Sequence, residues 1–295
     1  MAGTGNERWA AVARSLTEQT GEAFDLNSVE PAAGGSINQA VILHFRKQPP
    51  AFVKWQAGGD PMPYETEADA LNAIHATDTI RVPAVYGQGS LDGGGCWLAI
   101  EWLDLGGRGD GGALGRALAA LHRVEQTRFG WHRDNVIGAT PQPNGWSDDW
   151  IAFYREQRLE HQFRLARKNG LRIRESDTLL ETLPVFFESY TPQPSLLHGD
   201  LWGGNAGFLT DGTPVIYDPA SYQGDREADL AFTEVFGGFP DSFQAAYREA
   251  WPLDDGYRYR KTLYNLYHIL NHFNLFGGGY GSQAEGMVQE LLRNH

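Results

Sequence analysis

The chain has 295 residues, of which 41% are hydrophobic and 21% charged, so it is long enough for two packed lobes and has a globular composition. Its formal net charge of −13 disfavours nucleic acid and anionic membranes, because both repel an acidic surface. No apolar run reaches the length of a membrane span, no signal-peptide pattern is visible, and the single cysteine, Cys96, allows no internal disulfide, so we expect a cytoplasmic protein.

The first hundred residues predict a small, mostly β unit. The 6–20 segment has apolar residues at helical spacing, including Trp9, Val12 and Leu16. Glycine and proline pairs interrupt the apolar segments that follow, as they do between the strands of an antiparallel sheet. We predict two strands within 29–45 on either side of a glycine turn, further strands at 51–55, 81–86 and 96–101, and a helix at 63–77.

A glycine-rich break at 106–112 separates this unit from a mainly helical remainder. Within that remainder, Asp211-Gly212 predicts a hairpin over 206–217. We predict helices at 113–124, 148–169, 176–190, 226–236, 241–250, 256–275 and 283–293. The predicted fold is α+β, with a nucleotide-binding antiparallel β lobe at 1–103, a hinge at 101–104, and a larger, mainly helical lobe for catalysis and substrate binding at 104–295.

The segment 198–205, the predicted catalytic loop, has the residue types and spacing of a phosphoryl-transfer loop. Its pattern, His-x-Asp-x4-Asn, arises by chance in roughly 1% of chains of this length. In protein-kinase-like enzymes such an Asp accepts the proton of the substrate hydroxyl, while the Asn and a later Asp hold metal ions. We therefore predict Asp200 as the base. Asn205 and Asp218 are the predicted Mg²⁺ ligands, because both offer hard oxygen donors.

The small lobe contains residue types that bind the phosphates of ATP. Lys54, on the third strand, is predicted to contact the α- and β-phosphates and to pair with Glu67, with Glu65 as an open alternative. A Gly-Gly pair alone predicts only a turn, but before such a strand it favours a phosphate-binding loop. The predicted loop residues are Gly34, Gly35, Ser36 and Asn38.

The end of the 96–101 strand is the predicted crossing between the lobes. Main-chain groups of Glu101, Trp102 and Leu103 would there meet the adenine edge. ATP and Mg²⁺ are therefore the expected cofactors.

Two positions depart from protein kinases. Gly199 precedes the base where those enzymes have an arginine, which pairs with a phosphorylated activation loop. Pro219-Ala220 follows Asp218 in place of Phe-Gly. Both departures favour a small-molecule kinase that needs no activation by phosphorylation.

With these features the chain resembles the fructosamine kinase, or ketosamine-3-kinase, family, which is related to aminoglycoside and choline kinases. The resemblance spans nearly the whole chain, and Trp202 within 198–205 separates it from the other two groups. Further matching segments are 129–138, 218–231, 236–239 and 265–278. The resemblance implies a protein-kinase-like bilobal fold, MgATP as donor and phosphorylation of a ketosamine at its 3-hydroxyl.

The resemblance also implies a role in the repair of glycated amines, or deglycation. Enolisation of the sugar toward C1 places the C3 phosphate in an allylic position, so it can leave and free the amine. Some relatives have a cysteine in the glycine loop that can link two chains, whereas Ser36 stands here, so we expect a monomer.

Several residues near the motif are candidates for contact with the acceptor. The indole of Trp202 could stack on a sugar or attract the ammonium of a ketosamine, and the acids that follow Asp218 could attract the same charge. His198 and Asp229 are expected to support the catalytic loop. The predicted substrate residues are Trp202, Tyr222, Asp225, Glu227, Asn271 and His272.

The expected partner is a small-molecule or protein-linked ketosamine, with no nucleic acid and no membrane. Two alternatives remain open. One is a kinase for another small amine-bearing substrate, such as an aminoglycoside. The other is a non-catalytic nucleotide-binding module, against which the complete set of Lys54, Asp200, Asn205 and Asp218 argues.

Overall fold

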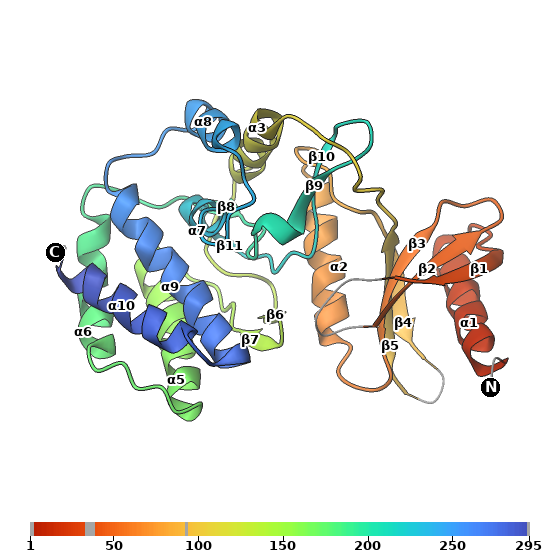
Figure 1. Ribbon diagram of the computed structural model, residues 1–295, viewed down its shortest axis with the longest axis horizontal. Helices are drawn as coiled ribbons and strands as arrows, with labels where there is room; N and C mark the ends of the chain where they lie inside the picture. Colours follow the sequence, from red (N-terminus) through yellow and green to blue (C-terminus); the bar gives the residue numbers. More distant parts are fainter. Residues whose placement is uncertain (1–2, 33–38, 92–93, 294–295) are drawn as a thin grey trace.

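The computed structural model describes residues 3–32, 39–91 and 94–293. The predicted loop residues Gly34, Gly35, Ser36 and Asn38 lie outside the described residues. The chain forms two lobes, one built on a five-stranded antiparallel sheet and one larger and mainly helical, as Figure 1 shows. The predicted α+β bilobal fold is confirmed.

Two helices cover opposite faces of the small-lobe sheet, α1 (Gly3–Thr20) and α2 (Met62–His75) (Figure 1). The strands follow the order β1-β2-β3-β5-β4. Along β5, Trp97 packs in the cluster with α1, and Leu98 packs in the cluster with α2, because successive strand side chains point to opposite faces. The strands are β1 (Leu26–Pro31), β2 (Gln39–Phe45), β3 (Ala51–Gln56), β4 (Val85–Ser90) and β5 (Cys96–Glu101).

The strand predicted at 81–86 begins later, at Val85. Its first residues pair with the large lobe instead, since Arg81 forms a parallel bridge with Val215 and its carbonyl accepts a hydrogen bond of 3.0 Å from the amide of Ile216. Pro83 has no N–H to donate to a strand. The segment before β4 therefore contacts the large lobe and is not part of the sheet.

The large lobe is built from helices that surround short two-stranded ribbons. Its helices are α3 (Gly111–His122), α4 (Trp150–Tyr154), a π-helix (Arg155–Glu160), α5 (His161–Lys168), α6 (Ser176–Thr182), a 3-10 helix (Leu183–Phe187), a second 3-10 helix (Gly203–Asn205), α7 (Arg226–Phe232), α8 (Asp241–Ala250), α9 (Tyr257–Phe276) and α10 (Tyr280–Arg293). None of the helices described for this chain is long and apolar enough to cross a membrane.

The predicted hairpin over 206–217 is present as β9 (Ala206–Phe208) and β10 (Pro214–Ile216). Two other ribbons were not predicted, β6 (Asn135–Ile137) with β7 (Thr140–Gln142), and β8 (Pro194–Leu196) with β11 (Gln223–Asp225). Each of these strands is only three residues long, too short to produce an alternating pattern. The β8–β11 pair sets the segments before the catalytic loop and after Asp218 side by side.

Helices α3 and α8 lie side by side at one end of the large lobe (Figure 1). A Cβ atom added to Gly115 of α3 would stand 2.3 Å from the carbonyl oxygen of Phe243 in α8. A side chain at Gly115 must therefore push the two helices apart.

We expect Gly115→Ala to lower the free energy of unfolding by about 1–3 kcal/mol, because its methyl group overpacks the α3–α8 contact. Gly286→Ala is the matched control, since a Cβ atom at this position of α10 meets no other atom within 4 Å and alanine favours a helix. Urea unfolding measures both variants. Equal stability of the two would contradict the close contact.

Candidate active site

Lys54 on β3 joins the two lobes through its ammonium group. Its Nζ lies 2.7 Å from Oε1 of Glu67 on α2 and 2.5 Å from Oδ1 of Asp218, which follows β10. Burial lowers the pKa of Lys54, but the two carboxylates outweigh it and raise the pKa above its usual value. Of the two acids left open by the sequence, Glu67 is the partner of Lys54, whereas Glu65 pairs with Arg133 at 2.7 Å.

The buried carboxylate of Asp229, in α7, holds the start of the catalytic loop. Its two oxygens accept hydrogen bonds from the backbone amides of His198 at 2.6 Å and Gly199 at 2.8 Å. A third partner is the ring of His122 on α3, at 3.1 Å. This geometry agrees with the supporting role expected for Asp229, whereas His122 carried no signal in the sequence.

Gly199 can occupy its place only because it has no side chain. Its φ of +83° lies in the left-handed region, and a Cβ atom would stand 2.1 Å from the carbonyl oxygen of Ala220. The close approach is reinforced by a 2.9 Å hydrogen bond from the amide of Ala220 to the carbonyl of His198. The segment after Asp218 thus lies directly against the catalytic loop.

Asp200 and Asn205 face each other within the catalytic loop. The amide nitrogen of Asn205 donates to the carbonyl oxygen of Asp200 at 2.9 Å and to its carboxylate at 3.3 Å. Burial, together with the charges of Asp218 and Asp229, raises the pKa of Asp200 to about 7, against the opposing hydrogen bond from Asn205. A carboxylate with this pKa is suited to accept a proton near neutral pH.

Asn205 and Asp218 fit a magnesium ion that is completed by a nucleotide. The Asn205 amide nitrogen also donates to the carbonyl oxygen of Asp218, 3.4 Å away, so its amide oxygen is the atom left for a metal. The Asp218 carboxylate is 45% exposed. No group of three His, Cys, Asp or Glu side chains among the described residues could hold a metal alone. One carboxylate and one amide oxygen suit Mg²⁺ that is also bound by phosphate oxygens and water.

The strand end at Glu101 connects the two lobes. The amide of Glu101 donates to the carbonyl of Ala84 at 2.8 Å, so it is not available to an adenine ring. Trp102 is exposed and stacks on Phe52 with ring centroids 6.0 Å apart, while Leu103 is buried. The amide of Trp102 donates to the carbonyl of Pro50 at 3.1 Å, so the carbonyls of Glu101 and Trp102 and the main-chain groups of Leu103 remain candidates.

The family model for fructosamine kinase matches residues 8–294. The chain belongs to the fructosamine kinase family. It is 45% identical to a protein of Synechocystis named "Probable ketoamine kinase" over 289 residues, which cover 97% of each chain. It is 42% identical over 285 residues to the chloroplastic protein-ribulosamine 3-kinase of Arabidopsis thaliana, covering 94% of this chain and 86% of the relative.

Solved structures support the same family and extend the fold beyond it. A candidate fructosamine-3-kinase from Haemophilus somnus superposes with a TM-score of 0.88 at 29% identity, covering 97% of this chain and 98% of the other. Choline kinase from Streptococcus pneumoniae superposes with a TM-score of 0.61 at 12% identity, with 97% and 99% covered. The second likeness shows a shared fold alone. This fructosamine kinase family member is thus an ATP-dependent phosphotransferase.

The structure contradicts the predicted substrate contacts of Tyr222, Asp225 and Glu227. Asp225 and Glu227 are completely buried, and Tyr222 is 3% exposed. Asp225 accepts hydrogen bonds from the hydroxyls of Tyr190 and Tyr264. Glu227 forms a bidentate ion pair with the equally buried Arg260, at 2.6 and 3.1 Å. Asp225 and Glu227 thus link the start of α7 to α9, and Tyr222 packs against Phe153 inside the large lobe.

Asn271 is also buried, so the same correction applies to it. Its amide group lies 3.5 Å from the carbonyl of Ile137 and 3.4 Å from the amide nitrogen of Gln162, and both contacts are inside the large lobe. It follows that four of the six predicted substrate residues belong to the interior of this family member.

Trp202 and His272 remain as accessible candidates and lie in one aromatic group. Trp202 is 41% exposed, and its ring centroid is 6.5 Å from that of Phe236. Phe236 in turn lies 4.9 Å from the ring of half-buried His272 on α9. The Trp202 indole covers Gly204, where a Cβ atom would stand 2.2 Å from the ring. These three rings form an aromatic surface next to the segment that carries Asp200.

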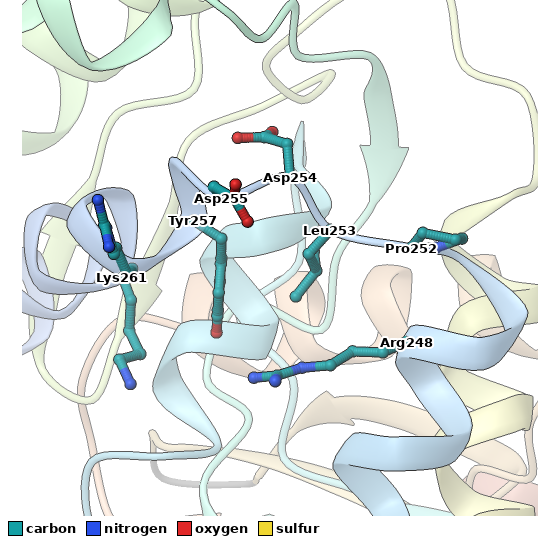
Figure 2. A pocket seen from close by; sticks show the side chains of 8 residues that line it. Arg248, Pro252, Leu253, Asp254, Asp255, Tyr257 and Lys261 are labelled. Atoms are coloured by element: carbon teal, nitrogen blue, oxygen red, sulfur yellow. The ribbon is translucent and has the colours of Figure 1, made fainter.

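A hollow lies at the start of α9, away from Asp200, Asn205 and Asp218. Figure 2 shows this pocket of about 420 Å³, with Arg248 and Lys261 extending toward the side where the hydroxyl of Tyr257 lies. Both cations already pair with Glu234, at 3.9 and 2.8 Å. Its lining residues are Arg248, Pro252, Leu253, Asp254, Asp255, Tyr257, Arg258 and Lys261. Charges of both signs line it, and no catalytic-loop residue does.

We expect Asp200→Asn to raise the melting temperature by a few degrees at pH 8. The raised pKa means that above pH 7 the folded protein must carry a charge that its surroundings disfavour, and the amide removes this charge. The increase in melting temperature should become smaller below pH 7, where Asp200 is protonated in the folded state. It should disappear near pH 3.8, the ordinary pKa of an aspartate. Thermal denaturation between pH 4 and 8 measures it.

Asp211→Asn is the control, since this exposed aspartate accepts a hydrogen bond from the amide of Thr213, which lowers its pKa. Asp211→Asn should not raise the melting temperature at pH 8. A gain for Asp200→Asn that is independent of pH would contradict the assignment.

Proposed function

We propose that the protein uses MgATP to phosphorylate the 3-hydroxyl of ketosamines, sugars joined to an amine as in fructosamines and ribulosamines. Support comes from the family and from one observation that carries the proposal. The acid suited to take a proton, Asp200, lies within one loop with the metal-binding candidate Asn205, while Lys54 joins Asp218 to Glu67. The proposed lobe boundary is the connection at 101–104.

In this proposal each polar group has one task. Asp200 accepts the proton of the attacking hydroxyl, and its pKa of about 7 allows this near neutral pH. Lys54 orients the α- and β-phosphates, while Asn205 and Asp218 hold magnesium, which when bound neutralises charge on the phosphates. The backbone of Gly34, Gly35, Ser36 and Asn38 would cover the phosphates.

The acceptor is proposed to bind at the aromatic surface formed by Trp202, Phe236 and His272. An indole face attracts the positive charge of a ketosamine amine and packs against a sugar ring. Because Asp225 and Glu227 are buried, the aromatic surface rather than these acids is the proposed contact for the positive charge of the acceptor. The aromatic surface, open at Trp202, therefore favours a ketosamine, either free or attached to a protein.

We also propose that the enzyme acts as a monomer in the cytoplasm. Cys96, the single cysteine, is 2% exposed, so its thiol does not reach a second chain. The role that follows from ketosamine phosphorylation is the repair of glycated amines, because the 3-phosphate makes the sugar–amine linkage unstable.

The proposal predicts acceptor-dependent ATP consumption with fructosamines, ribulosamines and glycated peptides, and much less with aminoglycosides. Asp200→Asn should bind MgATP normally but lose turnover by roughly 10²- to 10⁴-fold, since the hydroxyl then has no proton acceptor. A coupled assay for ADP measures both. Turnover of aminoglycosides alone, or wild-type turnover by Asp200→Asn, would overturn the substrate or the base.

Trp202→Leu should raise the KM for the ketosamine by about 5- to 20-fold through the lost cation–π contact, while the KM for MgATP stays unchanged. Trp146→Leu is the control, because Trp146 is similarly exposed, at 42%, but lies outside the catalytic loop. Steady-state kinetics with each substrate varied separates the two effects. An equal change in both variants would argue against the aromatic acceptor site.

A further inference from the structure

Arg133, in the connection between α3 and β6, reaches across to the small lobe. Its guanidinium lies 2.7 Å from Oε2 of Glu65 and 3.4 Å from Oδ2 of Asp69, both on α2. The neighbouring ring of His132 lies 3.2 Å from the same Asp69 oxygen. We call these four residues the Arg133 network. In this network, Arg133 and His132 of the large lobe contact two acids that lie one helical turn apart on α2.

The Arg133 network contacts one side of α2 through Glu65 and Asp69, and Lys54 contacts another side through Glu67. Residues four apart share a face of a helix, whereas residues two apart point in different directions. Glu65 and Asp69 therefore turn toward the large lobe, and Glu67, between them, turns toward Lys54. Contacts that hold Glu65 and Asp69 fix the rotation of α2 about its own axis, and this rotation determines where the Glu67 carboxylate lies.

Arg133 is itself held by a buried polar chain behind the catalytic groups. The side-chain amide of Asn144 donates to the carbonyl of Arg133 at 3.2 Å and to Oδ1 of Asn135 at 2.8 Å. Asn135 donates to the carbonyl of Ser221 at 2.9 Å, three residues after Asp218. Asn144 is fixed in turn by Arg158, at 2.7 Å, which is completely buried.

These contacts form a closed circuit. It runs from Lys54 through Glu67 and α2 to Arg133, and from there through Asn144 and Asn135 to the segment that carries Asp218, whose carboxylate returns to Lys54. The position of Lys54 is therefore set in two ways. Its own ion pairs with Glu67 and Asp218 act directly, and the Arg133 network acts through α2.

We propose that Arg133 is a positioning residue for the nucleotide site, which holds α2 from the large lobe so that Glu67 stays paired with Lys54. It touches neither the nucleotide nor the acceptor. The inference rests on the proposed phosphoryl transfer only for its kinetic consequence. Because Gly199 stands where protein kinases have an arginine, this contact sets the position of α2 without a phosphorylated loop.

The side chains of the Arg133 network are about one-third or more exposed, so the network contributes little to overall stability. Helix α2 remains packed on the sheet through Leu71 and Ile74, which are fully buried. Substitution of Arg133 should therefore leave the fold intact and release only the orientation of α2.

The test compares Arg133→Met with Arg128→Met in the full chain. Arg128 lies in the same connection and forms an exposed ion pair with Asp148 that does not involve α2, so it is a matched control. Calorimetry with magnesium and a non-hydrolysable ATP analogue measures nucleotide affinity without an acceptor. We expect Arg133→Met to weaken it about 3- to 10-fold, the size of a typical coupling between contacting residues, and Arg128→Met to leave it unchanged.

Three further measurements identify the cause. Hydrogen exchange in the nucleotide-free protein should become faster in α2 for Arg133→Met, with the large lobe unchanged. Glu65→Gln in the Arg133→Met background should add little to the loss of affinity, because the contact is already gone. In steady-state kinetics the KM for MgATP should rise while the KM for the ketosamine stays within about twofold.

Unchanged exchange in α2, or equal nucleotide affinity of the Arg133 and Arg128 variants, would overturn the proposal. Faster exchange throughout both lobes together with a lower melting temperature would also overturn it, by showing a general structural role. If the wild-type protein binds the analogue but phosphorylates no ketosamine, only the proposed substrate fails, because affinity and exchange are measured without it.

Discussion

The ammonium of Lys54 is the charge on which the arrangement of this protein depends. It is 12% exposed, so its charge requires nearby carboxylates, and they come from two segments far apart in the chain. Glu67 comes from a small-lobe helix and Asp218 from the end of a large-lobe strand. Because Asp218 reaches Lys54 only where the two lobes meet, this second ion pair favours one relative position of the lobes.

The catalytic loop depends on a second buried charge. The Asp229 carboxylate satisfies two backbone amides at the start of the loop and is itself held by His122, whose other ring nitrogen lies 2.8 Å from the hydroxyl of Tyr247. Burial raises the pKa of Asp229, but its hydrogen bond from His122 and the nearby rings outweigh this, so the net pKa is lowered. The Asp229 carboxylate thus holds the start of the loop, and its charge helps to raise the pKa of Asp200.

Local patterns in the sequence predicted the central parts of the site because those parts are local. The spacing of Asp200 and Asn205, the strand before Asp218 and the apolar alternation around Lys54 all lie within short segments. The structure brings these predicted residues into one place, with Lys54 in contact with Glu67 and Asp218 and with Asn205 in contact with Asp200.

The predictions failed where a side chain's surroundings come from distant segments. Asp225 and Glu227 follow Asp218 closely, which favoured an acceptor role, but their partners Tyr264 and Arg260 lie on α9, more than thirty residues away. An acid can be buried when such a partner pairs with it, and the spacing of residues along the chain does not show which distant residue that partner is. Arg133 and His122 were missed for the same reason.

The sequence by itself predicted the α+β bilobal fold from glycine breaks and apolar periodicity, and it predicted the family through its resemblance to known kinases. Motif spacing also led to the proposal of Asp200 as the base and of Asn205 and Asp218 as metal ligands. Only the tertiary structure decided that Glu67 rather than Glu65 pairs with Lys54, and that Tyr222, Asp225, Glu227 and Asn271 are interior while Trp202 is open to solvent. The physical reason is that charge pairing and burial are set by groups that meet across lobes and helices, and such groups have no fixed separation along the chain.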